Sequence, residues 1–222
     1  MNLIFRFPKA ARFGKHIPKS KVYTHASSGK RVRNLFVKEV EKITWAYKLS
    51  PQTVNIPAGE NTREIQILSI SLRTPDLSHE VLRAIDKSIP SPVLFSLEYK
   101  NQNSYAAAYK RPSEADKTKW VIGSYFETER TNNSEKKTEL PIVLNMDELY
   151  FFFLKELIPI RQRETDTIRT LVERAEAIIA KERQAAKIEG QVKREKQFNR
   201  KVELNHELNK LNTEIEKLRK AL

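Results

Sequence analysis

Three charged residues near the middle of the chain have the types and order found in many metal-dependent nucleases. Asp76 follows a proline, and Glu98-Tyr99-Lys100 comes later in the chain. In that chemistry the two carboxylates hold Mg²⁺, and the lysine orients the attacking water or steadies the developing charge. Here, however, Asp76 stands at the start of a predicted helix, where an acid is an ordinary cap, and Lys100 stands in a predicted turn. We interpret these residues as structural, with a metal-dependent nuclease as the alternative.

No other catalytic or metal-binding pattern is present in the sequence. The chain has no cysteine, and its four histidines are too far apart to form a local set of metal ligands. Ser28-Gly29-Lys30 is similar to the end of a phosphate-binding loop, but Thr24 replaces the earlier glycine and Arg31 replaces the hydroxyl residue that would hold magnesium. We therefore predict no catalytic residue, no metal site and no cofactor.

The first 38 residues, which we call the basic leader, are the strongest candidate for a binding site. They contain ten lysines and arginines and no aspartate or glutamate. This charge suits phosphate groups, and a helix predicted to begin near residue 31 adds free N–H groups. Such contacts give affinity without sequence selection. The alternative is that the cations merely solvate the surface. The predicted nucleic-acid contacts in the leader are Lys15, Lys19, Lys21, Lys30, Arg31 and Arg33.

A second basic pair follows a predicted strand. Tyr105, Ala107 and Tyr109 alternate along this strand and share one face, as a surface for stacked bases would require. We favour the interpretation that the tyrosines pack against a helix. Lys110 and Arg111 are nevertheless included among the predicted nucleic-acid contacts.

The charge is unevenly spread along the chain. Of the net charge of +13, residues 1–49 contribute +10, residues 50–154 contribute −2 and residues 155–222 contribute +5. The longest apolar cluster, residues 149–154, is far shorter than the roughly twenty residues of a membrane span. No apolar run near residue 1 is long enough for a signal peptide. Together with the absence of cysteine, these features predict a soluble, cytoplasmic protein without a membrane partner.

Apolar spacing predicts an α+β fold for a globular domain of residues 1–158. The pattern indicates a mixed or antiparallel β-sheet flanked by helices. Residues 8–30 are expected to be irregular, 100–104 a hairpin turn and 130–139 a surface loop. The expected strands are residues 3–7, 65–72, 93–99, 105–110 and 120–127, and the expected helices are residues 31–49, 78–88 and 147–158.

Residues 160–222 are expected to form a long helical coiled-coil arm, because they contain no proline and only one glycine. Two apolar stripes step by three and four residues, but their registers fail to join between Ala185 and Leu204. The arm is either one helix with a stutter or two helices folded back on each other. The second stripe, which begins at Leu204 and which we call the leucine stripe, is expected to face residues 165–189, a second copy of the chain or another protein. The predicted interface residues are Leu204, Leu208, Leu211, Ile215 and Leu218.

Three segments carry a family resemblance. The first runs from Phe7 to Lys19 and contains Phe7-Pro8, Phe13-Gly14-Lys15 and Ile17-Pro18-Lys19. The other two are Tyr109–Glu114 and Glu195–Asn205. With these, almost the whole chain resembles a bacterial family known as domain of unknown function 4391. The family has no assigned activity, so the resemblance implies no catalytic residues. It implies that similar proteins are encoded beside helicases and DNA methyltransferases in restriction-like defence clusters.

The charge pattern and the resemblance together predict a non-catalytic accessory subunit of a DNA-processing, restriction-modification-like assembly for anti-phage defence. Its basic leader would contact the phosphate backbone of DNA or RNA. Its C-terminal helices would bind a helicase or DNA methyltransferase subunit, or a second copy in a homo-oligomer. The alternatives are the metal-dependent nuclease and a purely structural coiled-coil interaction protein.

Overall fold

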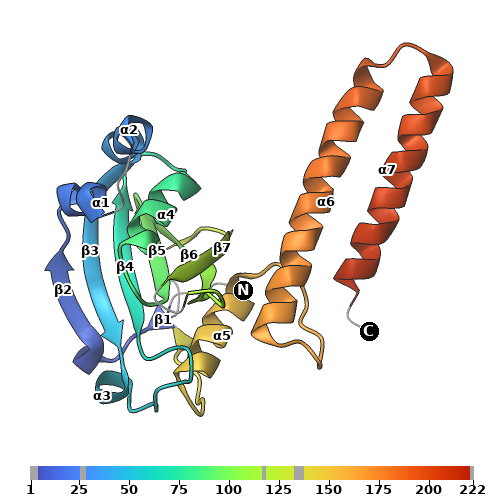
Figure 1. The fold of residues 1–222 in the computed structure, drawn as a ribbon. Coiled ribbons are helices and arrows are strands. Elements are labelled where there is room, and N and C mark those ends of the chain that lie inside the picture. Colours follow the sequence, from blue (N-terminus) through green and yellow to red (C-terminus); the bar gives the residue numbers. More distant parts are fainter. Residues whose placement is uncertain (1–4, 26–28, 117–118, 133–137, 221–222) are drawn as a thin grey trace. The chain divides into compact units, whose positions relative to one another are not determined.

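The computed structural model describes residues 5–25, 29–116, 119–132 and 138–220, which fall into two compact units, residues 1–157 and 158–222 (Figure 1). Unit 1 is a mixed α+β fold, and unit 2 consists mainly of two long helices. Within the described ranges, no helix combines the length and the apolar character that crossing a membrane requires.

Unit 1 is built on one mixed sheet. Its strands follow the order β2–β3–β4–β5–β6–β7, and β8 pairs with β6. Neighbours are antiparallel except β4 and β5, which are parallel because helix α4 (His79–Lys87) connects them. A separate parallel pair joins β1 (Phe5–Arg6) to β9 (Thr138–Glu139). The strands of the sheet are β2 (Arg12–His16), β3 (Val40–Leu49), β4 (Ile65–Leu72), β5 (Val93–Tyr99), β6 (Gln102–Pro112), β7 (Trp120–Glu127) and β8 (Thr131–Asn132).

Helices pack on both faces of this sheet (Figure 1). On one face, α1 (Lys19–His25), α2 (Lys30–Glu39) and α4 enclose an apolar core that includes Phe36 and Phe95. On the other face, α5 (Met146–Leu157) and β1 cover β6, and Phe5 contacts Phe153 and Tyr105 at ring distances of 5.1 and 5.2 Å. Short helical turns, η1 (Lys9–Ala11) and α3 (Pro51–Val54), complete the unit.

Most predicted elements of unit 1 are confirmed. The strands 65–72, 93–99 and 120–127 are present, and α4 and α5 lie close to the predicted helices 78–88 and 147–158. β6 is longer than predicted, so the hairpin turn narrows to Lys100 and Asn101. β1 covers only part of the predicted strand 3–7: it ends at Arg6, before Phe7, and residues 3 and 4 are outside the described residues. The predicted loop 130–139 carries β8 and β9 at its ends.

The predicted helix 31–49 is wrong beyond residue 39, where α2 ends and β3 follows directly. Bulges between Val40 and Lys42, and between Trp45 and Tyr47, each disturb the pairing of β3 with β4. An extra residue at a bulge turns the two-residue step of a strand into a step of three. The buried residues Val40 and Ile43 are therefore spaced as they would be on a helix, although the backbone is extended.

The basic leader is also more regular than predicted. Residues 8–30 contain η1, β2 and α1 rather than irregular chain alone. β2 adds an edge strand to β3, and α1 packs through the buried Val22. Residues 26–28 are outside the described part. The described parts of the leader therefore pack on the sheet, and most of their cations lie on regular elements.

Unit 2 is a helical hairpin formed by α6 (Ile168–Arg194) and α7 (Phe198–Arg219). The hydroxyl of Thr167 caps α6 by accepting a hydrogen bond from the backbone N–H of Thr170 at 3.2 Å. The helices run antiparallel, and ion pairs of 2.5 Å join Lys181 to Glu214 and Arg219 to Glu182. The single long arm is thus not found, and the second of the two predicted arrangements is the one present. The break in heptad register marks the turn at residues 195–197.

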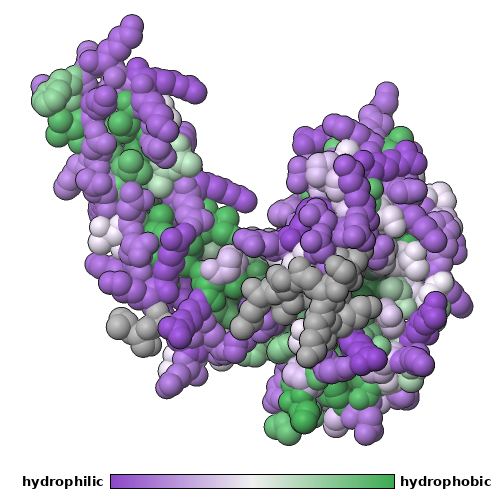
Figure 2. Space-filling model, turned by 180° about the vertical axis from the view of Figure 1, so that it is seen from behind, coloured by the Kyte–Doolittle hydropathy of each residue, from purple (hydrophilic) through white to green (hydrophobic). Residues whose placement is uncertain are grey.

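The leucine stripe of α7 packs against α6 of the same chain. Viewed from behind, the hairpin is mainly hydrophilic on its outside, with apolar residues gathered along the seam between the helices (Figure 2). This seam uses the side chains predicted to bind a partner, so another protein would have to contact different residues of the closed hairpin. Leu204, Leu211 and Ile215 are buried in it, and Leu208 and Leu218 are partly buried.

Candidate nucleic-acid interface

Three cations of the basic leader are exposed and available. Lys15 lies on β2, Lys21 on α1, and Lys30 is the first residue of α2. Among the described residues, none of the three has a carboxylate within ion-pair distance. No acid stands in the first turn of α2, so its free N–H groups face no negative side chain of their own helix. Among the six predicted leader contacts, these three lysines are the ones best placed for phosphate contact.

Lys19 has a structural position instead. Its ammonium group donates hydrogen bonds to the backbone carbonyls of Val40 and, at 3.5 Å, Phe36, at the C-terminus of α2. A cation is favoured there because the last carbonyls of a helix lack partners within it. Burial lowers the pKa of Lys19, and the charge of Arg73 lowers it further. Lys19 therefore ties α1 to α2 rather than offering a free charge.

The two arginines among the predicted leader contacts have partners within unit 1. Arg31 forms an exposed ion pair with Glu80 at 2.6 Å. The guanidinium of Arg33 lies over the ring of Tyr23, 5.9 Å from its centre. These contacts join α2 to α4 and to α1. A phosphate would have to compete with Glu80 for Arg31, whereas Lys15, Lys21 and Lys30 require no such exchange.

Lys110, predicted as a nucleic-acid contact, is buried in unit 1. Its ammonium group lies 2.9 Å from a carboxylate oxygen of Asp86, and both side chains are 1% exposed. It also donates to the backbone carbonyls of Asp86, at 2.6 Å, and Ile89. The hydroxyl of Tyr125 donates to the other carboxylate oxygen of Asp86 at 2.8 Å. Lys110 cannot reach a phosphate at the surface, so the prediction that it contacts nucleic acid is wrong.

Burial shifts the ionisation of the whole Asp86–Lys110 cluster. It raises the pKa of Asp86, although the charge and hydrogen bond of Lys110 oppose that shift. It lowers the pKa of Lys110, which the charge of Asp86 opposes in turn. Burial also raises the pKa of Tyr125, and the neighbouring Asp86 raises it further. Every charged group of the cluster is satisfied, so we interpret it as part of the core.

Arg111 lies far from the leader on the same sheet. It is half-buried and lies 3.5 Å from Glu114. It is on β6, four strands along the sheet from β2, and strands are spaced about 4.8 Å apart. This spacing puts roughly 19 Å between the strands that carry Arg111 and Lys15. The structure therefore does not bring Arg111 into one site with the leader lysines.

A pocket of about 380 Å³ lies beside the leader lysines, and we call it the aromatic–basic pocket. The rings of Phe13 and Trp45 line it, with centroids 4.8 Å apart and planes inclined at 49°. Lys15 and Lys21 also line it, and the ammonium of Lys15 is 4.8 Å from the centre of the Phe13 ring. Ile89, just beyond α4, lines it as well. Apolar surface and positive charge thus meet in one concave site.

Local backbone irregularities create this pocket. The pairing of β2 with β3 shifts between Arg12 and Lys15, where Gly14 adopts φ of +68°. Only glycine takes that left-handed conformation without strain. On β3, the bulge after Trp45 puts this residue and Tyr47 on opposite faces, and Trp45 Nε1 donates to Gln66 Oε1 at 2.8 Å. Trp45 is held against the core on the side where Phe13 lies.

The nuclease-like residues do not form one site in the described structure. Asp76 is exposed in the loop before α4, and it is not the helix cap that the sequence predicted; the cap position is Ser78. Lys100 lies in the β5–β6 turn with φ of 54°, and its ammonium is 5.2 Å from the centre of the Tyr99 ring. Among the described residues, no three histidine, aspartate or glutamate side chains gather to hold a metal ion.

Glu98 faces a separate cavity of about 360 Å³ on the α5 side of the sheet. Its carboxylate accepts a hydrogen bond from Ser69 at 2.8 Å. Phe5, Tyr47 and Tyr105 line the cavity too, but the described lining includes neither Asp76 nor Lys100. The predicted sheet face of Tyr105 is covered here, because its hydroxyl accepts a hydrogen bond from the N–H of Phe5 at 3.2 Å. It is not a free surface for stacked bases.

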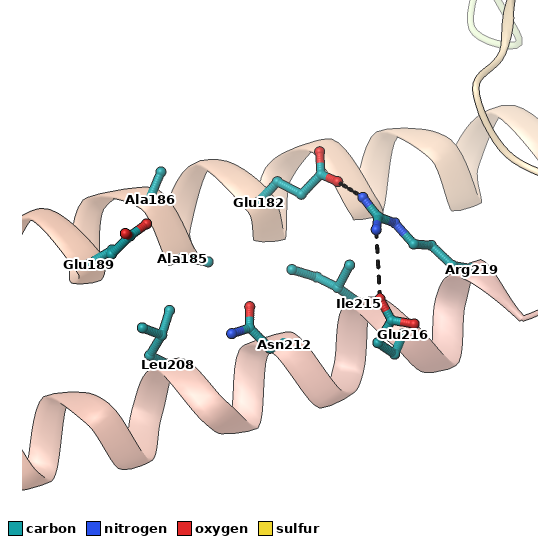
Figure 3. A pocket seen from close by; sticks show the side chains of 9 residues that line it. All are labelled: Glu182, Ala185, Ala186, Glu189, Leu208, Asn212, Ile215, Glu216 and Arg219. Carbon is teal, nitrogen blue, oxygen red and sulfur yellow. Dashed lines mark hydrogen bonds and ion pairs between the residues drawn. The ribbon is translucent and has the colours of Figure 1, made fainter.

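Unit 2 carries a groove of about 510 Å³ between α6 and α7 (Figure 3). Ala185, Leu208 and Ile215 supply apolar surface, while Glu182 and Glu216 flank Arg219. Arg219 pairs with Glu182 at 2.5 Å and with Glu216 at 3.6 Å. A third glutamate, Glu189, also lines the groove, which gives it an excess of negative charge. This groove does not suit a nucleic acid.

Phe13 and Trp45 are the site residues that the sequence interpretation missed. Trp45 was assigned to a helix, so its ring had no predicted place at the leader. Phe13 stands out in the sequence only as part of the family segment Phe13-Gly14-Lys15. An available signal was the position of Phe13 and Trp45 among the basic residues 1–49, since aromatic and basic residues combine at nucleic-acid sites.

Comparison with known proteins gives a family but no function. A family model described as "Domain of unknown function (DUF4391)" matches residues 5–215. No curated protein and no solved structure matches the chain.

Proposed function

The chain belongs to the family of this domain of unknown function, which supplies no activity, and we propose from its own surface that the protein binds the phosphate backbone of nucleic acids. The supporting observation is the exposed and unopposed set of Lys15, Lys21 and Lys30 on a leader without acids. Phosphate oxygens would pair with these ammonium groups and release counterions. This contact would hold DNA or RNA without reading its sequence.

Neutralising the three lysines is expected to weaken nucleic-acid binding without unfolding the protein. The variant is Lys15→Gln, Lys21→Gln, Lys30→Gln, and the measurement is affinity for a labelled duplex as a function of salt. Each lost phosphate contact removes about 0.9 from the slope of log K against log salt. The matched control is Lys187→Gln, Lys201→Gln, Lys210→Gln on the hairpin, which removes equal charge from exposed positions. Binding that is absent in wild type, or equal in both variants, would contradict the proposal.

We also propose that the protein serves as a non-catalytic, cytoplasmic accessory subunit of a DNA-processing defence assembly. The support is the family resemblance, which associates similar proteins with helicases and DNA methyltransferases. The hairpin would carry the protein contact through residues outside its seam. Phe198 and Val202 are exposed by 78% and 52%, at the end of α7 beside the turn. Co-purification from the native host, for wild type and a Phe198→Asp, Val202→Asp variant, tests this contact.

The nuclease alternative gives a direct prediction. Asp76→Ala and Glu98→Ala proteins are expected to behave as wild type in a Mg²⁺-dependent DNA cleavage assay, because the two residues line no common site. Circular dichroism would confirm that both variants are folded. If wild type cleaves DNA and both folded variants lose that cleavage, the protein is a nuclease and the accessory role is wrong.

A further inference from the structure

We propose that the aromatic–basic pocket receives an unpaired nucleobase, so that the nucleic acid bound by this surface is single-stranded. This inference rests on the proposed phosphate contact and adds the class of ligand. The pocket volume of about 380 Å³ is within the usual range of ligand sites, roughly 300–1,000 Å³. The pocket therefore has room for a flat heterocycle.

The exposed aromatic ring supplies the first reason for this ligand. Phe13 is 39% exposed although it contacts Trp45, so part of its ring is open to solvent beside the pocket. A base that stacks on such a ring gains favourable contact whatever its identity, since every base has a π-face. In a duplex both faces of each base are already stacked. Only an unpaired base can enter the pocket.

The charges around the pocket supply the second reason. Lys15 and Lys21 both line it, and no acidic residue is among its described lining side chains. A base in the pocket would carry its phosphates past these two ammonium groups. Most of the remaining wall is apolar, with Val22, Ile85 and Ile89 among its lining residues, and His16 and Ser88 add polar groups. Stacking surface with adjacent cations is the combination that proteins use to hold single strands.

The walls of the pocket are held by the fold, so the site is formed before a ligand arrives. Trp45 is fixed by its hydrogen bond to Gln66 at 2.8 Å. His16, which also lines the pocket, donates from Nδ1 to the carbonyl of Ile43 at 3.0 Å. Ile17 N–H donates to the same carbonyl at 2.9 Å, which ties the end of β2 to β3. A preformed site avoids the ordering cost of a flexible one.

Trp45 provides its own reporter for the test. The chain has two tryptophans, and a Trp120→Phe background leaves Trp45 as the only one. The probes are an eight-nucleotide oligothymidine, an abasic oligomer of equal length and a hairpin duplex with the same number of phosphates. We expect saturable quenching of Trp45 by the oligothymidine alone. In the same background, Phe13→Ala should weaken oligothymidine binding about tenfold or more, while Phe13→Tyr should keep it.

The salt dependence separates this inference from the phosphate proposal. Phe13→Ala should lower affinity without changing the salt slope, because Lys15 and Lys21 remain. If the three probes bind equally, without quenching and without an effect of Phe13→Ala, the base pocket is wrong while the phosphate proposal stands. If none binds at low salt, both are wrong. If decyl sulfate quenches Trp45 and the oligothymidine does not, the pocket takes an aliphatic chain and the inference is overturned.

Discussion

Replacing Lys110 with methionine is expected to destabilise unit 1 by about 3–5 kcal/mol, because it leaves the carboxylate of Asp86 buried without its countercharge. Both side chains are 1% exposed, so water cannot replace the lost ammonium group. The hydrogen bond from Tyr125 remains, but it does not neutralise the charge. The measurement is the free energy of unfolding in urea at neutral pH, followed by near-ultraviolet circular dichroism.

The pH dependence of this variant has a definite sign. Burial already raises the pKa of Asp86, and removal of Lys110 takes away a group that lowers it. The folded variant then binds a proton more tightly than the unfolded chain does. Its stability should therefore fall as the pH rises from the pKa of an unfolded aspartate, about 3.9, through the raised folded value. The loss relative to wild type should be smallest in acid.

Two further variants test whether the charge is the cause. Lys110→Met with Asp86→Leu removes both charges, and such replacements recover much of the stability lost by the single change. Lys87→Met makes the same substitution at an exposed position on α4 and should change stability by less than about 0.5 kcal/mol. A cost below 1 kcal/mol for Lys110→Met would show that water reaches the pair.

The sequence predicted the strands of this core well but placed Lys110 at the surface, as a nucleic-acid contact. Strands such as 65–72 and 93–99 were identifiable because β-branched or aromatic residues run through them without a competing helical pattern. Lys110 stands at the end of a strand beside Arg111, where a surface position is the ordinary expectation. Its burial depends on Asp86 of α4 and on the carbonyl of Ile89 just beyond that helix, both over twenty residues earlier in the chain. No local sequence pattern encodes contacts between residues so far apart in the chain.

The positive charge of the candidate site could be predicted from the sequence, but the shape of its pocket could not. The leader lysines were evident from composition, but their separation into free and engaged groups depends on tertiary contacts. Lys19 donates hydrogen bonds at the end of α2, and Arg31 forms an ion pair with Glu80. The pocket itself depends on irregular pairing in β2 and β3. Bulges leave a weak sequence signal because they shift the strand period toward that of a helix.

Introducing two aspartates into the seam, Leu211→Asp with Ile215→Asp, is expected to unfold the hairpin and to spare unit 1. Both residues are buried between α6 and α7, at 7% and 6% exposure. Each loses roughly 1.5–3 kcal/mol of apolar burial, and each new carboxylate would be desolvated if the seam stayed closed. Most of the stability of a helix in a protein comes from packing of its apolar face, so α7 should lose its structure when its contact with α6 is lost. Far-ultraviolet circular dichroism and limited proteolysis of residues 158–222 measure the effect.

A matched pair of substitutions separates folding from association. Phe198→Asp with Val202→Asp makes a similar apolar-to-acid change on the same helix, but at positions that are 78% and 52% exposed. This control should keep the helical signal, and so isolate any contact with another protein. Mass from light scattering is compared for all three proteins. If the Leu211, Ile215 variant keeps its helices but loses mass, the leucine stripe faces a second copy in solution and the closed hairpin is not the state that the stripe stabilises. If the Leu211, Ile215 variant loses helicity but has the same mass as wild type, the stripe stabilises the fold. A partner must then be sought at the exposed end of α7.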